Sequence, residues 1–144
     1  MEHVGTGLLL KQMMIGTLVV SATVAIHAEI LGLLTRRLPW LVNLSHRWPP
    51  RVADTGLIVI AVHVILGAHT LEVFLWALVL LMTGAVEGLE PAVYFSLVCF
   101  TTLGFGDITL PTEWRFLSAI LGANGFLLFG WSTAYMVEFI RKTR

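Results

Sequence analysis

The chain has 144 residues, of which 57% are hydrophobic and only 12% are charged, with a mean hydropathy of +0.86 and zero net charge. This composition excludes an ordinary soluble domain of the same length and is typical of a membrane protein. No basic cluster indicates a nucleic-acid partner, and the single cysteine, Cys99, excludes a disulfide bond within the chain.

Three apolar segments are long enough to cross a membrane, because a hydrocarbon core of about 30 Å needs about 20 helical residues. They lie at residues 8–34, 55–83 and 115–140. We therefore expect three transmembrane helices. The first helix and the basic loop after it form an N-terminal unit, residues 1–54, and the rest of the chain, residues 55–144, forms a second unit.

Charge predicts the orientation of these helices. The segment 84–115 is mainly acidic, whereas the segment 35–54 and the C-terminal tail are basic. Basic loops remain in the cytoplasm, so we expect a multi-pass protein of the plasma (inner) membrane with its N-terminus outside and its C-terminus inside. The basic residues are Arg36, Arg37, Arg47, Arg51, Arg141, Lys142 and Arg144.

A shorter helix is predicted at residues 91–102, between the second and third spans. Pro91 fits the first turn of a helix, where its missing N–H costs nothing. Twelve residues are too few to span the membrane. The glycines of the following Thr-Thr-Leu-Gly-Phe-Gly-Asp segment, residues 101–107, allow left-handed backbone conformations. We therefore expect a helix that enters the membrane and returns through a non-helical loop.

Residues 94–107, Tyr-Phe-Ser-Leu-Val-Cys-Phe-Thr-Thr-Leu-Gly-Phe-Gly-Asp, resemble the pore region of the potassium-channel family. In that family an aromatic pair opens the pore helix, and Thr-Val-Gly-Tyr-Gly-Asp or a variant follows. The resemblance covers residues 55–140. It implies an all-α membrane protein with three transmembrane helices, a re-entrant pore helix and a selectivity-filter loop. It also implies a homotetramer, because one filter strand cannot encircle an ion.

The resemblance further implies a passive channel rather than an enzyme. Its partners would be identical subunits and the lipid bilayer, and it would need no cofactor besides permeant K⁺. Backbone carbonyls would bind K⁺, with the Thr102 hydroxyl at the inner mouth and the Asp107 carboxylate at the outer mouth. The implied filter comprises Thr102, Leu103, Gly104, Phe105 and Gly106. The residues that would support it are Tyr94, Phe95 and Asp107. The hinge candidates on the inner helix 115–140 are Gly122, Gly125 and Gly130.

Two filter positions depart from the family pattern. Leu103 replaces the usual valine, which preserves the carbonyl, and Phe105 replaces the usual tyrosine, which removes a hydroxyl. A potassium-selective channel is the first hypothesis. There are two alternatives: a weakly selective cation channel, and a non-conducting or metal-binding membrane subunit. Each hinge candidate also has a second interpretation, because glycine allows close packing of membrane helices.

Several polar residues lie inside the predicted spans, where a charged side chain costs about 2.5–3.5 kcal/mol. By helical rise, we expect His27, Glu29 and His63 to meet between the first and second helices. His69 and Glu72 are three residues apart and share a face. Asn124 lies at a similar depth and faces either the pore or that pair.

Three hypotheses explain these polar residues. They form interhelical hydrogen bonds, or they sense pH because histidine titrates near neutrality, or they bind haem or a transition metal. No metal-ligand spacing in the sequence supports the third hypothesis.

Overall fold

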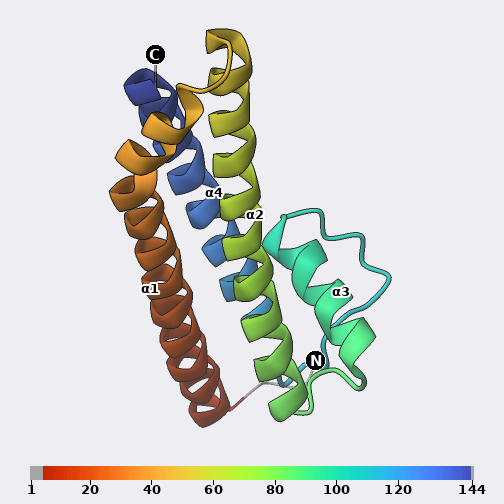
Figure 1. Ribbon diagram of the computed structural model, residues 1–144. Helices are drawn as coiled ribbons and strands as arrows, with labels where there is room; N and C mark the ends of the chain where they lie inside the picture. Colours follow the sequence, from red (N-terminus) through yellow and green to blue (C-terminus); the bar gives the residue numbers. More distant parts are fainter. Residues whose placement is uncertain (1–4, 144) are drawn as a thin grey trace.

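The computed structural model describes residues 5–143 and contains four α-helices in that range (Figure 1). They are α1 (Thr6–Ser45), α2 (Pro50–Met82), α3 (Leu89–Phe100) and α4 (Arg115–Thr143). Three of them, α1, α2 and α4, are long and apolar enough to cross a membrane, and α3 is a short apolar helix. The predicted fold class, an all-α membrane protein with three spanning helices and one shorter helix, is confirmed.

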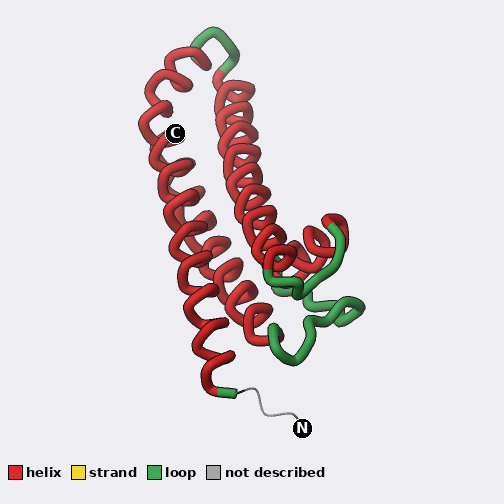
Figure 2. The backbone as a smooth tube through the Cα atoms, turned by 90° about the horizontal axis from the view of Figure 1, so that it is seen from below, coloured by secondary structure: helices red, strands yellow, loops and turns green. Residues whose placement is uncertain are grey.

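The three long helices lie side by side and alternate in direction (Figure 1). α1 begins at the end of the bundle opposite to the end where α4 finishes. α3 starts at the same end as α1 and runs only part of the way along the bundle, after which the chain returns to that end. Figure 2 shows a short loop at one end and the longer loops gathered around α3 at the other. Residues 1–4 and 144, which include both predicted termini, lie outside the described residues.

The expectation of a loop over residues 35–54 is wrong. α1 continues through Pro39 to Ser45, and α2 begins at Pro50, so only residues 46–49 form the turn. A proline inside a helix costs about 3 kcal/mol. Burial of apolar side chains from both helices against the end of α4 offsets this cost. The side chains in this cluster are Leu34, Leu38, Leu57, Ala61 and Phe139.

The short helix α3 lies two residues earlier in the chain than the sequence indicated. It begins after Gly88, which has a φ of 90° that suits glycine, and Pro91 lies in its first turn. It ends at Phe100, because Thr102 leaves the right-handed helical region with a φ of 61°. The loop that follows α3 therefore starts at Thr101.

The main apolar core joins α2, α3 and α4, with Val19 of α1 at its edge. Side chains that are completely or almost completely covered form its centre: Trp76, Leu80, Phe100, Leu117, Leu121 and Leu128. Because Phe100 is the last residue of α3, this core fixes the point where the non-helical loop begins.

Candidate functional site

The loop after α3 has an alternating backbone. Thr102, Gly104 and Gly106 have φ values of 61°, 57° and 77°, so every second residue is left-handed. In an extended strand successive carbonyls point to opposite sides, and alternating handedness turns them toward the same side. Glycine adopts this conformation readily, whereas a residue such as Thr102 is strained there by about 1–2 kcal/mol. The sequence indicated both glycines but not the left-handed Thr102.

The last turn of α3 holds the first part of this loop. The backbone N–H groups of Leu103 and Gly104 both donate to the carbonyl of Val98, at 3.0 and 3.3 Å, and the Thr102 N–H donates to Cys99 at 2.9 Å. The side chains of Leu103 and Phe105 are 60% and 65% exposed within one chain. The loop is therefore anchored by its backbone, while its apolar side chains are not covered by the subunit itself.

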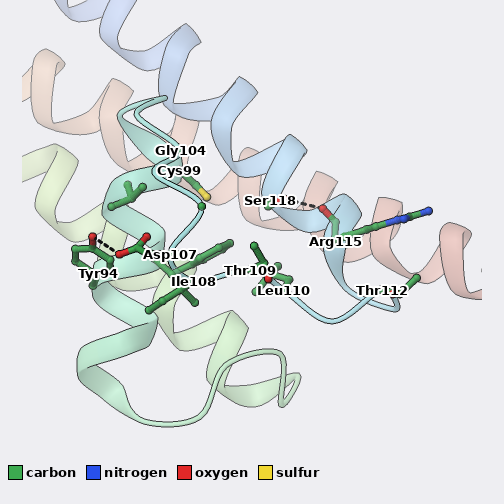
Figure 3. A pocket seen from close by; sticks show the side chains of 13 residues that line it. Tyr94, Cys99, Gly104, Asp107, Ile108, Thr109, Leu110, Thr112, Arg115 and Ser118 are labelled. Atoms are coloured by element: carbon green, nitrogen blue, oxygen red, sulfur yellow. Dashed lines mark hydrogen bonds between the residues drawn. The ribbon is translucent and has the colours of Figure 1, made fainter.

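A side-chain hydrogen bond closes the far end of the loop (Figure 3). The Tyr94 hydroxyl on α3 donates to the Asp107 carboxylate at 2.6 Å. This bond holds the pKa of Asp107 below its usual value and raises the pKa of Tyr94. The neighbouring Phe95 is buried in the core. Tyr94 therefore ties the end of the loop back to α3.

A pocket of about 440 Å³ separates the loop from the beginning of α4 (Figure 3). Side chains of α3, the loop and α4 line it, among them Tyr94, Val98, Asp107, Arg115 and Ser118. The loop is consequently held mainly by α3.

The three glycines proposed as hinges differ in their surroundings. A Cβ atom on Gly125 would collide with the backbone of Phe100, and one on Gly122 would lie 3.4 Å from the Cys99 carbonyl oxygen. A Cβ atom on Gly130 would have no neighbouring atom within 4 Å. Gly122 and Gly125 therefore allow α4 to approach the end of α3, which is a packing role; hinge motion stays a prediction.

A family model described as "Ion channel" matches residues 58–142, more than half of the chain. The chain belongs to this ion-channel family. The match contains α2 from Ile58 onward, α3, the loop and all of α4 but its last residue, and it leaves out α1. Ion channels conduct passively, so the protein is not an enzyme. Neither the search of curated proteins nor the search of solved structures found a match.

A ring of four polar side chains joins the three spanning helices of the channel. The Glu72 carboxylate lies 2.9 Å from Nδ1 of His27 and 2.9 Å from Nδ1 of His69. The Ser132 hydroxyl lies 3.2 Å from Nε2 of His27 and 3.0 Å from Nε2 of His69. All four residues are at most 6% exposed. The sequence placed His69 and Glu72 together but missed Ser132, because one serine in a membrane helix gives no distinctive signal.

The expected meeting of His27, Glu29 and His63 does not occur. Glu29 and His63 are exposed, and Nδ1 of His63 donates to the Val59 carbonyl of its own helix at 2.8 Å. Helical rise gives the depth of a side chain along the bundle but not the direction in which it points. Each helical residue turns the side chain by about 100°, so Glu29 points about 160° away from His27.

Asn124 points into the interior of the helix bundle and does not contact His69 or Glu72. It is 1% exposed, and its Oδ1 accepts hydrogen bonds from Thr23 and Trp76, each at 2.9 Å. This contact forms a second polar layer that joins α1, α2 and α4. The sequence alone gave no indication of Thr23 in this role.

Proposed function

We propose that the channel is a homotetramer that conducts K⁺ selectively through the loop after α3. The observation that carries this proposal is the left-handed backbone at Thr102, Gly104 and Gly106. A carbonyl ring that replaces an ion's hydration shell requires successive carbonyls on one side of the strand. The alternation at these three residues supplies that arrangement immediately after a short apolar helix.

In this proposal the carbonyls of Thr102, Leu103, Gly104 and Phe105 coordinate K⁺, together with the Thr102 hydroxyl. The C-terminal end of α3 carries a partial negative charge, which favours a cation beneath the loop. The Asp107 carboxylate, kept ionised by the hydrogen bond from Tyr94, adds negative charge at the outer mouth.

Four copies are proposed because one strand supplies only one side of an ion's coordination shell. The exposed side chains of Leu103 and Phe105 support this assembly, since neighbouring subunits would cover them. α4 would line the inner pore.

We place the channel in the plasma (inner) membrane, with the α1–α2 turn and the end of α4 in the cytoplasm. Both lie at one end of the bundle (Figure 1). The basic residues Arg47, Arg51, Arg141 and Lys142 lie in or beside these segments, as the positive-inside rule requires. Modulation by pH stays a prediction from the sequence, and conduction does not depend on it.

Ion flux through the purified protein in liposomes tests this proposal, with K⁺ and then Na⁺ as the permeant cation. We expect K⁺ flux that Na⁺ cannot support. Gly104→Ala should abolish it, because a Cβ at a φ of 57° strains the backbone. The matched control is Gly67→Ala, a helical position with open space, which should conduct normally.

Equal flux of the two ions would instead establish a weakly selective cation channel. No flux of either ion would overturn the proposal. Native mass spectrometry of the detergent-solubilised channel should show four copies per particle, and any other number would contradict the assembly.

A further inference from the structure

Three ligand-type side chains converge where α1 and α2 meet. His27, His69 and Glu72 each offer a ligand atom, and these atoms lie within 4.8 Å of one another. Both histidine Nδ1 atoms lie 2.9 Å from a Glu72 oxygen. Two ligands of a tetrahedral zinc ion, each about 2.0–2.1 Å from the metal, lie about 3.3 Å apart. The spacing between each histidine and Glu72 is therefore close to that of a metal site.

Ser132 contacts the other ring nitrogen of both histidines. Its hydroxyl oxygen lies 3.0 and 3.2 Å from the Nε2 atoms of His69 and His27. A hydroxyl oxygen has two lone pairs, so it can accept an N–H from both rings. In that tautomer both Nδ1 lone pairs are free and point toward the Glu72 carboxylate. Histidines that bind metals usually donate their other N–H in this way.

The four contacts of the ring need either a fourth proton or a cation. With Glu72 ionised and both histidines neutral, His27, His69 and Ser132 provide three protons for four short contacts. If both rings donate to Ser132, unshared electron pairs face one another between the rings and Glu72. A divalent cation placed there satisfies both nitrogens and the carboxylate together.

The surroundings of the three residues are mostly apolar. Aromatic rings enclose the histidines: Phe129 lies 4.5 Å and Phe100 5.6 Å from His69, and Trp131 lies 5.3 Å from His27, between ring centroids. The negative end of the α3 dipole, at Phe100, favours positive charge nearby. An apolar shell of this kind excludes water from a site.

We propose that His27, His69 and Glu72 bind a divalent transition metal, with zinc as the best match to two imidazole nitrogens and one carboxylate. The metal would connect α1 to α2, and Ser132 would connect the site to α4. His27 lies outside the segment matched by the family model, so the site depends on the additional N-terminal helix. The proposal does not require that the channel conduct.

Zinc binding by the purified full-length chain tests the proposal. The protein is stripped with a chelator, equilibrated with Zn²⁺ alone, and the bound metal is counted per chain. We expect one zinc ion per chain for the natural sequence. His69→Gln and Glu72→Gln should abolish binding, and Ser132→Ala should weaken it about 10–100-fold.

Matched controls are His63→Gln and Glu29→Gln, which change exposed residues on the same two helices and should leave binding unchanged. Circular dichroism verifies that each variant folds. Should the ligand variants fail to fold, Co²⁺ added to the natural protein gives an independent result, because its visible spectrum reports nitrogen ligands.

Absence of stoichiometric zinc and of a cobalt spectrum in the natural protein would overturn the proposal, and would mean that a proton completes the ring instead. Zinc that disappears with His63→Gln would also overturn it. Neither measurement uses an ion gradient, so failure here leaves the conduction proposal intact, and failure of conduction leaves the metal site intact.

Discussion

Gly125→Ala tests the contact between α4 and the end of α3. A Cβ at this position would lie 2.7 Å from the carbonyl carbon and 2.9 Å from the Cα of Phe100, and it would also collide with the carbonyl oxygen. These are backbone atoms, so relief requires α3 itself to move. Overpacking of this kind costs about 1–3 kcal/mol, while alanine gains about 1 kcal/mol over glycine in a helix. We expect a net loss of up to about 2 kcal/mol.

The same displacement should reduce K⁺ flux, because the last turn of α3 anchors Leu103 and Gly104 through the Val98 carbonyl. Thermal unfolding in detergent and liposome flux measure the two effects. Gly130→Ala is the control, since it has no neighbour within 4 Å and should be as stable as the natural protein or more stable. If Gly125→Ala matches Gly130→Ala in both measurements, the packing argument is refuted. Altered gating at unchanged stability would favour the hinge interpretation.

Two further substitutions test other contacts. Tyr94→Phe removes the hydrogen bond that lowers the pKa of Asp107. The Asp107 carboxylate should therefore take up a proton at a higher pH than in the natural protein. The decrease of K⁺ flux on acidification should accordingly begin at a higher pH. If that decrease begins at the same pH as in the natural protein, this role of Tyr94 is contradicted. Asn124→Leu removes the acceptor of the buried Trp76 indole N–H. An unsatisfied buried donor costs about 1–3 kcal/mol, which thermal unfolding should detect, whereas the exposed control Asn43→Leu should have little effect.

Much of the fold was predictable, because each spanning helix must satisfy its backbone hydrogen bonds internally and cover itself with apolar side chains. Hydropathy therefore indicates the spans without knowledge of their partners. The wrong expectation of a loop over residues 35–54 has a different cause, which is tertiary packing around Pro39. The helix persists there because Leu34 and Leu38 pack on residues of α2 and α4, and tertiary packing of this kind cannot be inferred from local propensity.

In the candidate site, too, features set by local backbone chemistry were predictable and features set by packing between helices were not. Left-handed conformations at Gly104 and Gly106 follow from local backbone chemistry, so the sequence indicated them. The buried polar contacts depend on the rotation of each helix about its axis. Depth could be estimated from helical rise, but rotation could not, which is why His63 was wrongly expected to meet His27.

The polar face of α1 also has a consequence for biosynthesis. Gln12, Thr23 and His27 are buried on one side of this helix. On α4, Gln12 accepts from the backbone N–H of Phe116, and Thr23 and His27 contact the side chains of Asn124 and Ser132. These partners follow 104, 101 and 105 residues later in the chain, respectively. At a synthesis rate of about 5–20 residues per second, α4 emerges about 5–20 s after α1. During that interval Gln12, Thr23 and His27 lie in the membrane, or in the insertion machinery, without their partners on α4.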